Sequence, residues 1–161
     1  MKNIKWSIIL INLILLMGYF NYSVGKKEAL LSDGQLILLK LAPVDPRSLM
    51  QGDYMRLRYE ISSNIRIDSI SKRGYCVVKL DSIGVARKIR LQSGNSPKMA
   101  DEFLIEYTAG KWNINIGAES FFFEEGKATK YDKAKYGGVR VDDKGNSILV
   151  GLYNEQMKKI E

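Results

Sequence analysis

The apolar segment near the N-terminus is the feature that most restricts how this chain can fold. Residues 6–25 carry no charge, and the stretch Ile8–Met17 is aliphatic apart from Asn12. As a helix rising 1.5 Å per residue, residues 6–25 span about 30 Å, which is the hydrocarbon thickness of a bilayer. Aromatic side chains stand at both ends of this segment, where membrane proteins place their aromatic belts. Residues 1–25 are therefore predicted to form a transmembrane helix.

Two lysines precede the apolar segment, so a cleaved signal peptide is the competing interpretation. The segment is longer than the apolar core of a usual signal peptide, and the bulky Tyr22 and Val24 crowd the small residues where a cut would fall. We therefore expect an uncleaved signal-anchor. A long C-terminal domain translocates largely regardless of flanking charges. The expected arrangement has the N-terminus inside, the helix in the inner (cytoplasmic) membrane, and residues 26–161 as one extracytoplasmic, periplasmic domain.

The residue composition excludes several classes of function. The chain has 161 residues, no histidine and a single cysteine. Without histidine it lacks most acid–base, triad and zinc chemistry. The cysteine, Cys76, cannot form an internal disulfide, and its strand-like surroundings favour a buried, inert thiol. The formal net charge is +7, but the basic residues are scattered rather than gathered in a stripe, so we expect no nucleic-acid partner. No cofactor or metal is expected.

Residues 26–161 show the short alternating patterns of an antiparallel β protein. In residues 54–61 the expected buried face holds Met55, Leu57, Tyr59 and Ile61, and the expected wet face holds Tyr54, Arg56, Arg58 and Glu60. Further strands are predicted at 35–42, 74–80, 85–91, 103–108, 112–116, 138–141 and 147–153. Residues 124–135 have the spacing of one short helix. The predicted fold is mainly β, an antiparallel sandwich or partly closed barrel with one short helix, preceded by the transmembrane helix.

The segment with the most information is residues 42–59, which runs from the end of the strand predicted at 35–42 through most of the strand predicted at 54–61. Its two prolines, an aspartate able to form an Asx turn and a glycine that permits a tight bend favour one fixed loop conformation. It contains Pro43-Val-Asp-Pro-Arg47 followed by Gly52-Asp-Tyr-Met-Arg-Leu-Arg-Tyr59. Together with Glu119-Ser-Phe-Phe-Phe-Glu-Glu-Gly126, these residues resemble the bacterial GDYXXLXY family over nearly the whole chain.

The resemblance implies a membrane-anchored protein with an aromatic strand that runs into Glu-Gly near residues 119–126. Members of the family are often encoded beside multi-pass membrane proteins. The resemblance therefore implies a place in a membrane complex, and it brings no particular reaction with it.

The candidate site gathers around the same segment. Its predicted members are Asp45, Arg47, Asp53, Tyr54, Arg56, Arg58, Glu119 and Glu125. Arginine and tyrosine are favoured at protein interfaces because they combine contact area with directional hydrogen bonds. The hypothesis is an accessory or scaffolding subunit that binds a multi-pass membrane protein. The structural alternative is that the aspartates cap turns, Arg47 pairs with one of them, and Tyr54 packs at a corner.

Two enzymatic interpretations stay open, although the sequence leans away from an enzyme and no catalytic residue is assigned. A carboxylate pair could cleave a glycosidic bond or bind a hard cation such as calcium. The carboxylates considered are Asp45 or Asp53 with Glu119, Glu124 or Glu125. A Ser/Lys peptidase would use Ser48 as nucleophile and Lys79 or Lys88 as base. Ser48, however, lacks the Ser-Met-x-Pro context of signal peptidases.

Overall fold

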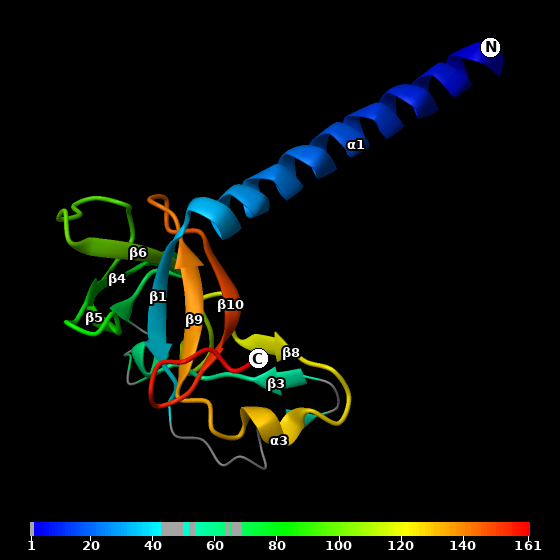
Figure 1. Ribbon diagram of the computed structural model, residues 1–161. Coiled ribbons are helices and arrows are strands. Elements are labelled where there is room, and N and C mark those ends of the chain that lie inside the picture. Colours follow the sequence, from blue (N-terminus) through cyan, green and yellow to red (C-terminus); the bar gives the residue numbers. More distant parts are fainter. Residues whose placement is uncertain (1, 43–49, 52–53, 64, 66–68) are drawn as a thin grey trace.

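The structure is a computed structural model of the chain, and it describes residues 2–42, 50–51, 54–63, 65 and 69–161. One long helix, α1 (Lys2–Asp33), projects from a β domain (Figure 1). Its span Ile4–Asp33 is long and apolar enough to cross a membrane, and none of its most apolar window is buried against the domain. Within the described residues a helix is thus present where one was expected, and it continues past the apolar segment as far as Asp33.

Antiparallel sheets make up the rest of the described chain. The strands are β1 (Gln35–Lys40), β2 (Met50–Gln51), β3 (Tyr54–Arg56), β4 (Arg73–Leu80), β5 (Ala86–Gln92), β6 (Glu102–Ala109), β7 (Ile114–Asn115), β8 (Ser120–Phe122), β9 (Tyr136–Val141) and β10 (Ser147–Tyr153). They form three sheets with the orders β1–β9–β10, β2–β3–β8 and β5–β4–β6–β7. Two short segments, the 3-10 helix η1 (Glu60–Ser62) and α3 (Ala128–Tyr131), connect them. The predicted class, mainly antiparallel β, is confirmed, and the described strands do not close into a barrel.

Bridges between strand ends join the three sheets around one core. Just beyond β1, Leu41 forms an antiparallel bridge with Tyr59, and within β1 Leu38 forms a parallel bridge with Val85. All three sheets contribute buried side chains to the core: Ile37, Leu39, Met55, Leu57, Tyr59, Cys76, Val78, Ile105, Tyr107, Val139, Val141 and Leu152. Because β1 starts at the end of α1 and its far end meets Tyr59, the β2–β3–β8 sheet lies at the end of the domain remote from α1 (Figure 1).

In the segment 54–61 the buried and exposed side chains alternate as predicted, but the strand itself is shorter, because β3 covers only 3 residues. The N–H of Leu57 donates to the carbonyl of Glu119 (2.7 Å), whereas the carbonyl of Arg58 accepts from the N–H of Ala42 (2.8 Å). The backbone therefore changes partner from the β8 side to the β1 side between adjacent residues, and then turns into η1. The predicted alternation holds throughout, with apolar side chains buried and charged ones exposed.

The helix predicted over residues 124–135 is also shorter, because α3 has only 4 residues. Gly126 adopts a φ of +80°, in the left-handed region, so a helix cannot continue through it. The N–H groups of Lys127 and Ala134 donate to carbonyls three residues earlier, which is the spacing of tight turns. The apolar side of the segment is still used, since Tyr131 packs against the core.

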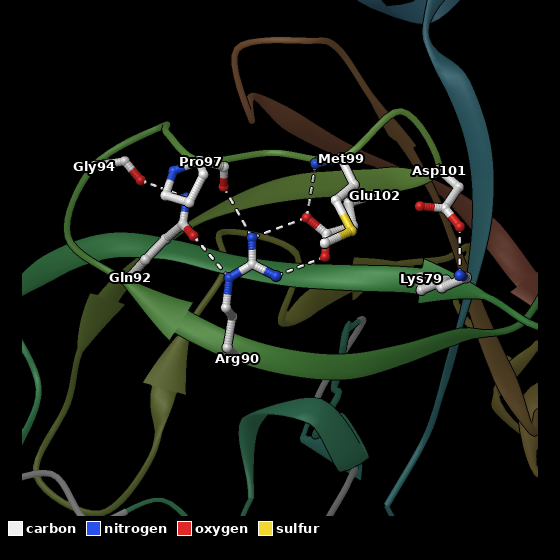
Figure 2. Close-up of polar contacts among 8 residues, drawn as sticks. All are labelled: Lys79, Arg90, Gln92, Gly94, Pro97, Met99, Asp101 and Glu102. Carbon is white, nitrogen blue, oxygen red and sulfur yellow. Dashed lines mark hydrogen bonds and ion pairs between the residues drawn. The ribbon is translucent and has the colours of Figure 1, made fainter.

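The loop 93–101 between β5 and β6 is fastened to the four-stranded sheet by a partly buried ion pair (Figure 2). The carboxylate of Glu102 accepts from both Nη atoms of Arg90 (2.6 and 2.9 Å) and from the N–H of Met99 (3.0 Å). Arg90 also donates to the carbonyl of Pro97 (2.8 Å). These bonds, that of Arg90 above all, lower the pKa of Glu102 to about 2. The bidentate pair thereby fixes the course of the loop.

The junction between α1 and the domain is held by Arg140 of β9. Its Nη1 donates to the carbonyls of Ser32 (3.1 Å) and Gly34 (2.7 Å). The last carbonyls of a helix lack partners within the helix and carry the negative end of its dipole, so they favour a cation. No side chain fits at Gly34, because a Cβ there would clash with the carbonyl oxygen of Leu30. The Arg140 side chain therefore attaches the end of α1 to the β1–β9–β10 sheet.

Candidate interaction site on the β2–β3–β8 sheet

Three predicted site residues point outward from the segment 54–58, which begins in the β2–β3–β8 sheet. Tyr54 and Arg56 lie on β3 with one residue between them, and Arg58 follows at the same spacing. Both arginines are exposed and Tyr54 is half-buried. The loop residues predicted for the site lie outside the described residues and stay predictions: Asp45, Arg47 and Asp53. The structure thus brings together the strand part of the predicted site.

Strand β8 adds two residues to this face. Its register places Phe122 opposite Tyr54 and Ser120 opposite Arg56. The rings of Tyr54 and Phe122 are in contact, with centroids 5.8 Å apart and planes tilted by 38°. Phe122 is nevertheless 73% exposed, which leaves most of a large apolar side chain in solvent. We call these five residues the arginine–aromatic face: Tyr54, Arg56, Arg58, Ser120 and Phe122.

The opposite side of the same sheet is packed. The ring of Phe121 meets Tyr131 of α3 edge-on, with centroids 5.0 Å apart, and lies 6.4 Å from Phe123. Such pairs add about 0.5–1.5 kcal/mol each beyond the area they bury. Met55 of β3, which is buried in the core, lies opposite Phe121. The arginine–aromatic face is therefore displayed on a sheet whose inner side is held in place.

The inward residues of the same motif segment are structural. Tyr59 is fully buried, and its hydroxyl donates to the carbonyl of Ala118 (2.6 Å). Burial, and to a lesser degree the Glu119 carboxylate, raises the pKa of Tyr59, so the hydroxyl remains a donor. The ring lies against Gly137 of β9, where a Cβ would come within 2.8 Å of its Cε1 atom. Tyr59 thus connects three parts of the core: the residues that follow β3, the residues just before β8, and strand β9.

The two predicted glutamates are not among the five residues of the arginine–aromatic face. Glu119 is half-buried, and its Oε1 accepts from the N–H of Ile116 (2.5 Å), which holds the turn before β8. Glu125 is exposed in the segment after β8. The carboxylate pairs expected for glycosidic hydrolysis or calcium also require Asp45 or Asp53, which lie outside the described residues. Those pairs therefore stay predictions.

The lysines considered for a Ser/Lys peptidase are engaged elsewhere. Lys79 forms an ion pair with Asp101, and the hydrogen bond to that carboxylate raises the pKa of the lysine (Figure 2). A general base needs the opposite shift, because it must be deprotonated near neutral pH. Lys88 donates to the carbonyl of Ser63 (3.2 Å). The candidate nucleophile, Ser48, lies outside the described residues.

The chemistry of the arginine–aromatic face is that of recognition. Guanidinium groups bind carboxylates through paired hydrogen bonds, and an exposed aromatic pair offers apolar contact area. Within the described ranges, no group of three or more His, Cys, Asp or Glu side chains is placed to hold a metal ion. The described part of the site therefore fits an acidic, partly apolar ligand surface.

Sequence reasoning did not identify Ser120 and Phe122 as site residues. The family resemblance indicated an aromatic strand near residues 119–126, and β8 is that strand. The three consecutive phenylalanines 121–123, of which β8 holds the first two, conceal the alternation of faces, because apolar residues fall on both sides. The pairing with β3 decides that Phe122, rather than Phe121, points outward. That pairing depends on the fold and has no local signal.

Fold and site together define a class: an antiparallel β domain that continues from an apolar helix suited to membrane anchoring and that displays an arginine–aromatic face. The chain belongs to the GDYXXLXY protein family, because the sequence model of that family matches residues 16–152. The match therefore runs from within α1 to β10. Neither a curated protein nor a solved structure matches the chain.

Proposed function

We propose that the chain is a membrane-anchored accessory subunit whose arginine–aromatic face binds the extracytoplasmic part of a multi-pass membrane protein. The observation that carries this proposal is Phe122, which is 73% exposed although its ring contacts that of Tyr54. Arg56 lies opposite Ser120 on the same face, and Arg58 follows two residues later. Neither arginine has an ion-pair partner among the described residues. Aromatic residues and arginine are the types enriched at the centres of protein interfaces.

The position of the face supports a partner outside the bilayer. In the proposed topology α1 crosses the membrane with its N-terminus inside, and the β domain is extracytoplasmic. The face lies at the far end of β1, and the 6 residues of that strand extend about 20 Å from the end of α1. Figure 1 shows β3 and β8 at the end of the domain opposite to α1. A soluble loop or domain of the partner can reach this position, whereas its membrane helices cannot.

The edge of β8 indicates how such a segment would bind. Within the described chain, β3 is the one strand paired with β8. The bond from the N–H of Leu57 to the carbonyl of Glu119 marks a hydrogen-bonded pair, so the backbone groups of Ser120 and Phe122 point to the open edge. An extended segment can add a strand to such an edge. Acidic side chains in that segment would meet the two arginines, so the proposed ligand is an extended, acidic segment.

The proposal is tested by crosslinked affinity purification of the full-length protein from native membranes. The wild type is expected to recover one multi-pass membrane protein, and the variants Phe122→Ser and Arg56→Glu are expected to lose it. Matched controls change the same chemistry elsewhere: Ile89→Ser on β5, where the side chain is 52% exposed, and Lys158→Glu on an exposed loop. Retention of the partner by both face variants would contradict the proposal, as would loss in the controls.

A further inference from the structure

The turn between β6 and β7 presents an exposed tryptophan that the proposed function does not use. Trp112 is 86% exposed, although it is one of only 2 tryptophans in the chain. The turn is tight: Ala109 pairs with Ile114, and the N–H of Gly110 donates to the carbonyl of Asn113 (2.8 Å). The indole is therefore held at the tip of a short, closed hairpin.

Basic side chains lie both at the base of this hairpin and in its turn. The carbonyl of Lys72 accepts from the N–H of Ala109 (2.9 Å), and the next residue, Arg73, pairs with Thr108 of β6. Lys72, Arg73 and Lys111 are exposed, and none of them forms an ion pair with another described residue. The hairpin thus combines an exposed indole with three exposed cations.

The base of the hairpin lies beside the part of α1 that leaves the membrane. A cleft of about 1130 Å³ separates the two, with Ser23, Lys26 and Leu30 on the helix side. Arg73, Thr108 and Asn115 line its other side, and the last two are paired at the base of the hairpin. The uncharged segment of α1 ends at Gly25, so this stretch of helix emerges at the level of the lipid headgroups.

We propose that the β6–β7 hairpin is a second membrane contact, in which Trp112 enters the headgroup region of the bilayer that α1 crosses. An indole favours this region because one edge is apolar while its N–H stays with water or headgroups. Lys72 and Lys111 add electrostatic attraction wherever the headgroups of that leaflet are anionic. With α1, this contact would fix the rotation of the domain about the helix. It does not depend on the partner bound at the arginine–aromatic face.

The test uses fluorescence of the full-length protein in vesicles. Trp6→Phe leaves Trp112 as the sole tryptophan. The variant is reconstituted in phosphatidylcholine vesicles with and without phosphatidylglycerol, with brominated lipids as membrane quenchers and iodide on both sides as the aqueous quencher. Bromolipid is expected to quench the emission strongly and iodide weakly. Adding Lys72→Gln and Lys111→Gln is expected to lower bromolipid quenching in the anionic vesicles to its value in phosphatidylcholine alone.

A matched control moves the single tryptophan to the other end of the domain. The triple variant Trp6→Phe, Trp112→Phe, Phe122→Trp places the indole on the arginine–aromatic face, where iodide is expected to quench it and bromolipid is not. Equal quenching of the two proteins by iodide, with no bromolipid effect on Trp112, would overturn the proposal. Bromolipid quenching of both would overturn it too, because the contact would then not be confined to the hairpin.

Discussion

The two tyrosines at the ends of the segment 54–59 are expected to respond very differently to loss of their hydroxyl groups. Tyr59 is fully buried and donates to the carbonyl of Ala118 at 2.6 Å. In Tyr59→Phe the ring is kept, but that carbonyl loses its donor in a place that water does not reach. Leaving a buried acceptor unsatisfied costs about 1–3 kcal/mol. Tyr54 is half-buried, and its hydroxyl has no hydrogen-bond partner among the described residues, so Tyr54→Phe should cost little.

The assay is thermal unfolding of the full-length protein in detergent micelles, followed by circular dichroism of the β domain. For a chain of this size each kcal/mol lowers Tm by about 3–4 °C, so Tyr59→Phe is expected to lower it by roughly 3–12 °C. Tyr54→Phe is expected to shift Tm by less than about 2 °C, as surface substitutions usually do. An unchanged Tm in Tyr59→Phe, or an equal loss in Tyr54→Phe, would refute the assignment of Tyr59 to the core and Tyr54 to the surface.

Three further substitutions test other contacts. The pKa of Glu102 is lowered to about 2 from its ordinary 4.5, so its ionised form stabilises the fold above pH 4.5 and this stability is lost as pH falls toward 2. Glu102→Gln should flatten the acid side of a urea-unfolding pH profile, and an acid slope equal to that of the wild type would contradict this role of Glu102. Arg140→Ala removes two bonds to the end of α1 and should speed hydrogen exchange in its last turn, and equal exchange would contradict that role. Gly137→Ala should destabilise by about 1–3 kcal/mol in urea unfolding, because the new Cβ would lie 2.8 Å from the Tyr59 ring; a neutral result would show that the ring can move aside.

Local patterns predicted much of this fold because they report on elements whose determinants are close in sequence. The apolar run identified the membrane-suited part of α1 by length and charge alone, although the helix continues to Asp33. The alternation in residues 54–61 placed each side chain on the correct face, although the strand itself is short. The thiol of Cys76, expected to be buried and inert, lies in the core, where burial raises its pKa to about 12.

What could not be predicted depends on partners that are distant in the chain or across a sheet. Arg90 and Glu102 sit on strands on either side of β4, and neither residue has a local pattern that marks it as paired. The switch of backbone partner near Leu57 and Arg58 requires β8 and β1 to approach the same segment from different sides. The outward position of Phe122 follows from that same pairing. Three of the five residues of the arginine–aromatic face were therefore visible as a strand pattern, and the other two depend on the fold.

The central claim, that the arginine–aromatic face is the partner-binding surface, is tested most directly by site-specific photocrosslinking in native membranes. A benzophenone amino acid replaces Phe122 in one full-length variant and Ile89, an exposed position on another sheet, in a second. We expect a crosslink from position 122 to one multi-pass membrane protein and none to that protein from position 89. The same adducts from both positions, or adducts from position 89 alone, would contradict the account.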